Sequence, residues 1–232
     1  MTQHALDLTS ELLRGMRLSG VNYRRIETSR PFGVEFGFVP GKAQFHFISR
    51  GPVLLRMVSG QRLMLQSGDA LFIPNGDGHV LLSDDQATVV NVSRLPSEPV
   101  CDSVSCVKNA CDDAKSDSAI IFSACMDFEL GGMQPLVKAM PEVMLVSSLL
   151  TSRPEIPPML AAMERESLTR QAGYAGILAR LADVVAALIV RGWVECGCGN
   201  ATGWVQVLRD PKLAKAIYVM HQQPGINWKV ED

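Results

Sequence analysis

The sequence has no excess of charge of either sign. Its 232 residues carry 22 lysines and arginines against 24 aspartates and glutamates, which gives a formal net charge of -2. Nucleic-acid binding depends on an excess of Lys and Arg that neutralises phosphates. The composition therefore argues against a segment that holds DNA by itself, but it does not exclude a basic domain further along the protein.

Long apolar runs are also missing. The longest run, residues 181–190, is interrupted by Asp183 and has about half of the roughly 20 residues that a bilayer requires. The first 17 residues lack the basic start and the apolar run of a signal peptide. We therefore expect a cytoplasmic protein that does not enter the membrane, with its six cysteines mostly as reduced thiols.

The common catalytic signatures are absent as well. The stretch 37–41 lacks the lysine of a P-loop, and no Gly-x-Ser-x-Gly elbow occurs. The neighbouring pair Asp84 and Asp85 is more typical of a solvated turn than of an acid–base couple. We expect no enzyme activity and no cofactor.

Short apolar runs separated by turn residues dominate the first half of the sequence. Between residues 20 and 95 they recur about every ten residues, with Gly, Pro, Asn and Asp between them. Several short strands at this spacing predict a barrel or sandwich. The predicted strands are 34–39, 43–48, 53–58, 62–65, 70–73, 79–82 and 88–92, with a further strand at 120–128.

The remaining segments have different patterns. Residues 1–19 have a helical apolar periodicity, and the polar stretch 96–118 predicts a long surface loop. Further helices are predicted from Pro157, over 174–195, and from Pro211, where Asp210 is the expected N-cap.

Two stretches resemble a known family. The first, Gly68-Asp-Ala-Leu-Phe-Ile-Pro-Asn-Gly-Asp-Gly-His79, is similar to the second cupin motif: a tight turn, a buried strand, and a glycine-rich turn that aims a histidine into a barrel. A fainter first motif lies at 44–48, followed by Gly51. Cupins are double-stranded jelly rolls.

The second stretch, from Trp204 through His221 and Pro224 to Trp228, resembles the opening of the AraC-type DNA-binding domain.

Together these stretches resemble AraC-family transcription regulators with a cupin sensor. The resemblance implies a mostly β fold with additional α-helices, in which a cupin-type jelly roll is followed by a helical dimerisation segment. We expect a sensor barrel with an N-terminal helix over 1–148, the dimerisation segment over 149–203, and the start of a truncated helix-turn-helix domain over 204–232. Neither recognition helix is present, so DNA binding is expected only through the missing C-terminal domain.

The expected effector site lies inside the barrel. Barrel residues expected to face inward and contact the effector are His46, His79, Phe36, Arg56 and Phe72. Arg56 would suit an anionic small molecule, unless it forms a surface salt bridge. His46 and His79 are the only histidines in the barrel, too few for the three-histidine iron or manganese site of catalytic cupins. Three roles stay open for the pair: hydrogen bonding in the interior, effector contact, and metal binding in a cupin dioxygenase or isomerase.

The cysteines allow a redox interpretation. Cys101, Cys106 and Cys111 recur every five residues in the polar stretch, and Cys196 and Cys198 follow a helix. Exposed thiols near Lys108 and Lys115 could be oxidised to a disulfide, so the regulator could respond to an oxidant instead of a small molecule. The alternatives are unreactive thiols and a zinc site completed by Cys125 or Cys196.

The helix predicted over 174–195 has a wide apolar face, with Arg180, Asp183 and Arg191 on its polar side. Such a face packs on the barrel, forms a homodimer interface, or does both, and the family resemblance favours a homodimer. A fragment without DNA-binding domain that forms mixed dimers with longer regulators is a further alternative.

Overall fold

Two β-sheets face each other in the computed structural model, which describes residues 17–101, 104–109, 118–129, 137–146, 153–169, 171–196, 211–223 and 225–229. The larger sheet has seven strands in the order β12-β6-β3-β11-β1-β10-β9. They are β1 (Arg17–Ser29), β3 (Lys42–Arg50), β6 (Ala70–Ile73), β9 (Ser97–Cys101), β10 (Val104–Asn109), β11 (Ser118–Glu129) and β12 (Met144–Leu145).

The smaller sheet has five strands in the order β5-β4-β7-β2-β8. They are β2 (Gly33–Phe36), β4 (Val53–Met57), β5 (Arg62–Leu65), β7 (His79–Leu82) and β8 (Val89–Asn91). Pairing is antiparallel except between β1 and β10 and between β2 and β8. This mostly β architecture of two sheets followed by helices confirms the predicted fold class.

The central strands of the larger sheet are buried on both faces, because their alternate residues enter different hydrophobic clusters. On β3, Phe45 and Phe47 belong to one cluster, whereas Ile48 belongs to the other. The inner cluster joins the facing sides of the two sheets and includes Leu71 from β6 and Leu55 from β4. The period of two in a strand produces this division.

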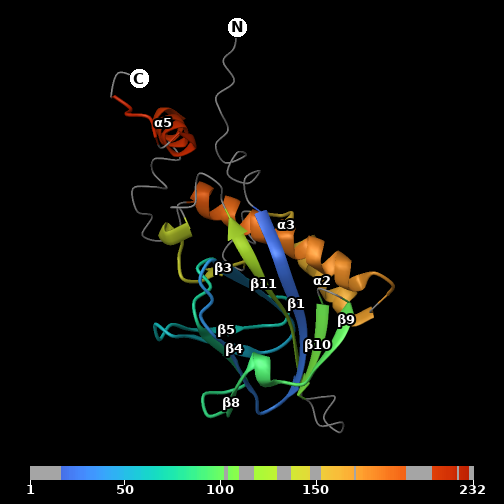
Figure 1. Ribbon diagram of the computed structural model, residues 1–232. Helices are drawn as coiled ribbons and strands as arrows, with labels where there is room; N and C mark the ends of the chain where they lie inside the picture. The colour runs from blue at the N-terminus through green and yellow to red at the C-terminus, as the bar shows by residue number, and fades with distance from the viewer. Residues whose placement is uncertain are drawn as a thin grey trace.

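Two helices cover the outer face of the larger sheet, α2 (Ile156–Thr169) and α3 (Tyr174–Cys196). Figure 1 shows them lying across β3, β11 and β1. Leu178, Val185 and Ile189 of α3 share the outer cluster with the phenylalanines of β3. The outer face of the larger sheet and the two helices thus share one hydrophobic cluster. The domain boundary placed at residue 148 stays a prediction.

Ion pairs join the turn immediately before α2 to the last turns of α3. Arg153 pairs with Glu195, and Arg191 pairs with Glu155. Both pairs are partly shielded from solvent, so they are worth more than freely exposed pairs. They hold the two helices antiparallel on the sheet.

The structure corrects two sequence predictions. The stretch 96–118 is not a single surface loop, because it contains the hairpin of β9 and β10, and Val104 and Val107 are buried. The helix expected over 1–19 does not extend to Arg17, where β1 begins, while residues 1–16 lie outside the described part. The other predicted strands and helices are present, with ends shifted by a few residues, and the last helix is α5 (Pro211–Gln222).

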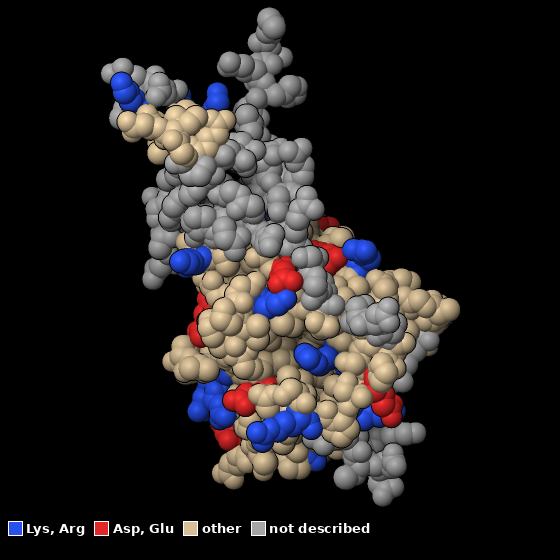
Figure 2. All heavy atoms as spheres, in the orientation of Figure 1, with Lys and Arg blue, Asp and Glu red and all other residues tan. Residues whose placement is uncertain are grey.

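Charged side chains of both signs are interspersed over the barrel on the face drawn in Figure 2. No helix within the described ranges is long and apolar enough to cross a membrane.

Candidate functional site

Two histidines meet between the sheets. His46 lies in the middle of β3, opposite Leu71 of β6 and Ser123 of β11. His79 is the first residue of β7, opposite Phe36 of β2. Both histidines are almost completely buried, with 0% and 1% of their surface exposed.

The histidines belong to a buried chain of hydrogen bonds. His79 Nδ1 lies 2.8 Å from the Asp77 carbonyl oxygen, His79 Nε2 lies 2.8 Å from His46 Nε2, and His46 Nδ1 lies 2.8 Å from Ser123 Oγ. The carbonyl only accepts, so His79 Nδ1 donates and its Nε2 accepts from His46 Nε2. Ser123 Oγ then donates to His46 Nδ1. One pair of neutral tautomers therefore pairs all four ring nitrogens.

Both rings are neutral at pH 7. Burial lowers the pKa of His46 well below its usual value, and the neighbouring His79 lowers it further. Burial also lowers the pKa of His79, to about 4, although the hydrogen bond to the Asp77 carbonyl acts in the opposite direction. A charged imidazolium would lose its hydration in this interior without gaining a counter-ion.

Phe36 completes this group. Its ring stacks on that of His79 at a centroid distance of 5.0 Å and meets His46 edge-on at 4.7 Å. The interior around the histidines is therefore aromatic, with a single neutral polar chain. Such a chain fixes the orientation of both imidazoles.

The turn that aims His79 inward depends on Gly76. Its φ is +64°, and a Cβ built there would lie 2.4 Å from the Lys42 carbonyl oxygen and 2.5 Å from that of Val39. The Gly76 amide donates to the Ile73 carbonyl, and the Gly76 carbonyl accepts from the Val39 amide. Only glycine combines this backbone conformation with such close approach.

A cavity of about 350 Å³ opens at this end of the barrel, and we call it the mouth cavity. Phe36 and His79 line it together with residues from the surrounding turns. The full lining is Glu35, Phe36, Gly37, Phe38, Val58, Ser59, Asp77, Gly78, His79, Val80 and Glu142.

The mouth cavity has an acidic wall. Burial raises the pKa of Asp77, and the negative charge of Glu142 raises it further. Glu142 also accepts a hydrogen bond from Ser59 Oγ at 2.5 Å. Two carboxylates thus interact unfavourably across this wall.

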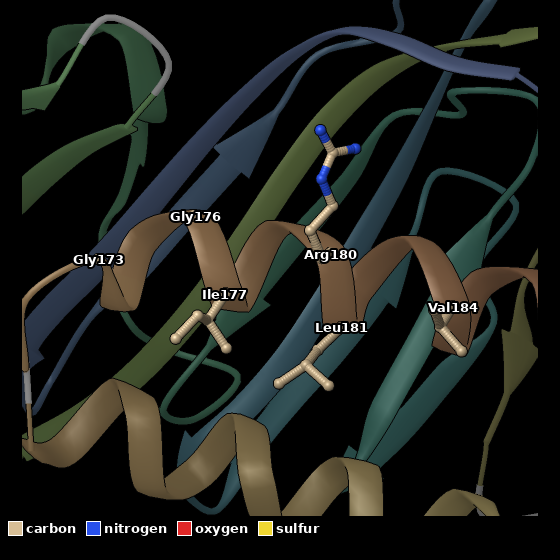
Figure 3. A pocket seen from close by; sticks show the side chains of 6 residues that line it. All are labelled: Gly173, Gly176, Ile177, Arg180, Leu181 and Val184. Atoms are coloured by element: carbon tan, nitrogen blue, oxygen red, sulfur yellow. The ribbon is translucent and has the colours of Figure 1, made fainter.

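A second depression lies on α3, with a volume of about 500 Å³. Ile177, Leu181 and Val184 project from one side of the helix, and Arg180 projects away from them (Figure 3). Ile177 and Val184 are each 44% exposed. We call this surface, which Gly173 and Gly176 also line, the α3 face.

Comparison with known proteins assigns the family. A family model described as a cupin matches residues 7–195, which is most of the chain. The chain belongs to the cupin family. It is of the AraC-type N-terminal class, as its resemblance to regulators of that family predicted.

One curated relative is the HTH-type transcriptional regulator AlkR of Acinetobacter baylyi. It is 24% identical over 190 residues, covering 80% of this chain and 60% of AlkR. The cupin chain thus spans less than two thirds of that relative.

Solved structures of ToxT from Vibrio cholerae are also similar. One crystal structure, from strain O395, has 9% identity and a TM-score of 0.38, over 94% of this chain and 68% of ToxT. A second, in a P21 form, has 10% identity and a TM-score of 0.39, over 91% and 68%.

The structure brings together three of the five predicted effector residues, His46, His79 and Phe36. It does not bring Arg56 to them. On β4, Val53, Leu55 and Met57 are buried, so the alternating residue Arg56 lies on the outer side of the smaller sheet. The expectation that Arg56 faces inward is wrong.

Phe72 also lies elsewhere. It belongs to the outer cluster and meets Phe128 edge-on at 5.2 Å, on the side of the larger sheet that α2 and α3 cover. Its neighbours Leu71 and Ile73 occupy the inner cluster. The expectation that Phe72 faces the barrel interior is wrong, because alternation places it on the opposite face.

The cupin barrel offers a metal ion two imidazoles, and each already donates or accepts through both nitrogens. Within the described ranges, no three or more His, Cys, Asp or Glu side chains are grouped to hold a metal ion. The residues therefore do not match the ligand set of a catalytic cupin.

Only some of the cysteines considered for a redox role lie in the described part of the structure. Cys106 lies on β10 and is buried, so the expectation of an exposed thiol is wrong there. Cys101 ends β9 and Cys196 ends α3, whereas Cys111 and Cys198 lie outside the described residues. Cys125 is half-buried on β11, and burial raises the pKa of its thiol. A redox role for Cys101, Cys111, Cys196 and Cys198 stays a prediction.

Three residues of the site escaped the sequence analysis: Ser123, Asp77 and Glu142. Asp77 lies inside the recognised motif, so its position could have suggested a role. Ser123 and Glu142 are distant in sequence from His46 and His79, and no local pattern marks them.

Proposed function

We propose that this cupin domain is the effector-sensing and dimerising part of an AraC-type transcription regulator and that its role is regulatory, not catalytic. DNA recognition would belong to a C-terminal helix-turn-helix unit, with α5 as its first helix. The similarity to AlkR supports this assignment. The lack of charge excess agrees with it, because the sensor itself has no need to hold phosphates.

The mouth cavity is our proposed effector site, and one observation carries this proposal. His79 and Phe36 line the cavity, and His79 is hydrogen-bonded to His46 and through it to Ser123 on the larger sheet. A ligand that contacts His79 therefore acts on a chain that ends on the sheet carrying α3. It alters the regulator only if it binds two arrangements of this chain with different affinity.

The histidines give little support to the alternative of a metal-dependent cupin enzyme. A general base needs a free nitrogen near its substrate, whereas every ring nitrogen here already has a partner. Both rings also titrate far from the pH at which histidine is an effective acid–base catalyst.

The α3 face is our proposed homodimer interface. Ile177 and Val184 are exposed apolar residues about two turns apart on a helix whose other side is buried in the core. Exposed apolar patches of this kind mark association surfaces. In a two-fold dimer the same face of each copy would pack against the other.

Native mass spectrometry of the purified chain, without chelator or added reductant, tests the sensor proposal. We expect a dimer without a transition metal, and the mass of any retained organic adduct would narrow the effector. One transition metal per chain would instead favour the cupin enzyme.

Sedimentation equilibrium tests the dimer. We expect the unaltered chain to be dimeric at tens of micromolar, and the double variant Ile177→Glu/Val184→Glu to be monomeric. The matched control is Met64→Glu, which changes an exposed apolar residue on β5 and should leave the dimer intact. A monomeric unaltered chain, or a dimeric double variant, would contradict this interface.

A further inference from the structure

The lining of the mouth cavity is acidic on one side and apolar on the other. Asp77 and Glu142 contribute two carboxylates, and no lysine or arginine is among its lining residues. The apolar part comes from Phe36, Phe38 and Val58. An anionic ligand would meet only like charge here, whereas a cation would meet opposite charge.

The carboxylates of Asp77 and Glu142 lie in a position where a bound cation would stabilise both of them. The charge of Glu142, together with burial, raises the pKa of Asp77, so ionised Asp77 and Glu142 destabilise each other. A positive group placed between them would favour the charged form of both. Glu142 is also held in place by its hydrogen bond from Ser59 at 2.5 Å.

The apolar rim indicates that the cation is organic. Phe38 is 62% exposed and Val58 is 83% exposed, on the two turns that flank the opening. Exposed side chains of this size can cover an aliphatic or aromatic body, and the face of a phenyl ring attracts a cation. A bare metal ion is less suited, because the described residues hold no group of three or more metal ligands.

We propose that the mouth cavity binds an organic ammonium compound, with its cationic group beside Asp77 and Glu142 and its apolar body against Phe36, Phe38 and Val58. This inference rests on the proposed function, because it names the chemical class of the effector. It replaces the anionic effector that Arg56 suggested in the sequence, since Arg56 points away from the interior.

Three probes that share a phenylethyl body test the class: 2-phenylethylammonium, 2-phenylethanol and 3-phenylpropionate. Binding is followed through the backbone amide signals of Gly78 and Ser59 in nitrogen-15 NMR spectra of the full chain at constant ionic strength. The ammonium is expected to shift both signals saturably, with a Kd at least about tenfold below that of the alcohol, and the carboxylate is expected to bind weakest.

Substitution of the carboxylates provides the second measurement. In Glu142→Gln and in Asp77→Asn the Kd of the ammonium should rise at least about fivefold, with the Kd of the alcohol unchanged. Glu98→Gln is the matched control, because Glu98 is an exposed carboxylate on β9 that pairs with Lys108. Circular dichroism establishes that each variant is folded.

The outcomes separate this inference from the proposed function. Equal or tighter binding of the alcohol or the carboxylate, or an unchanged ammonium Kd in both variants, would overturn the cationic class and leave the mouth cavity as effector site. Absence of any saturable shift with all three probes would overturn both. The dimer is tested independently by sedimentation.

Discussion

At the scale of single residues, the glycines of the barrel turns have different requirements. Gly76 and Gly41 both have a positive φ, of +64° and +73°. A Cβ at Gly76 would collide with two backbone carbonyls, whereas a Cβ at Gly41 meets nothing within 4 Å. Substitution of Gly41 therefore introduces backbone strain alone, whereas substitution of Gly76 adds a steric collision to that strain.

We expect Gly41→Ala to lower the free energy of unfolding by about 1 kcal/mol, the strain of a left-handed residue with a Cβ. Gly76→Ala should lower it by more than about 2 kcal/mol, since two backbone segments must also move apart. Urea denaturation of both variants measures the difference. Equal losses would mean that the turn before His79 accommodates the methyl group without displacement.

Residue-level prediction of the site was partly successful for a physical reason. His46 and His79 were recognised through the motif, which fixes their direction. The face that Phe72 occupies depends only on the alternation of residues along β6. All four residues of this strand are buried, so their hydrophobicity does not indicate which face each one occupies. The prediction for Arg56 was wrong for the same reason, because the face of β4 that it occupies was not determined from the alternation of its neighbours.

At the scale of elements, one contact ties the larger sheet to α3. Tyr23 of β1 donates a hydrogen bond to the Ala179 carbonyl at 3.3 Å and stacks on Phe122 of β11 at 5.4 Å. Burial raises the pKa of its hydroxyl, and the negative charge of Asp183 adds to this. Tyr23 thus remains a neutral donor toward α3.

Tyr23→Phe is expected to lower the free energy of unfolding by about 1 kcal/mol, because the partly buried acceptor on α3 loses its donor. Thermal or urea unfolding measures this loss. Tyr174→Phe, at the half-buried start of α3, is the matched control and should change stability by less than about 0.5 kcal/mol. If both variants lose the same amount, the Tyr23 hydroxyl contributes nothing specific to docking.

Some elements were predictable and others were not. The strands 62–65, 70–73 and 79–82 were predicted to the residue, because apolar runs between turn residues mark them. β1 and β10 were missed. Their sequences are rich in Arg, Ser, Lys and Asn, and they are strands because their neighbours in the sheet provide hydrogen-bond partners over the whole length. Such tertiary pairing leaves little trace in local composition.

At the scale of the whole molecule, the buried histidines make stability depend on pH. Their pKa values in the folded chain lie below the unfolded value of 6.5, for His79 at about 4. Between those values the unfolded chain binds protons that the folded chain does not, so stability falls as the pH falls. Each such histidine contributes a slope of up to about 1.4 kcal/mol per pH unit.

We therefore expect the free energy of unfolding to decrease from pH 6.5 toward pH 4. Urea denaturation at several pH values measures the slope. The imidazole signals of His46 and His79 in NMR spectra of the folded chain supply an independent check, since they should not titrate between pH 8 and pH 5.5. A signal from either ring that titrates near pH 6.5 would contradict the neutral hydrogen-bonded pair.

β11 separates the inner hydrophobic cluster, on the side of the histidines, from the outer cluster beneath α3. Ser123 bonds to His46 on one side of this strand, and Phe122, its covalent neighbour, stacks on Tyr23 on the other. Adjacent Cα atoms are a fixed distance of about 3.8 Å apart, so a shift of the Ser123 backbone also moves the backbone of Phe122. We therefore expect a ligand that shifts the backbone of β11 at Ser123 to move Phe122 and Tyr23 as well, and to act on α3 through the Tyr23 hydrogen bond to the Ala179 carbonyl, without contacting the helix itself.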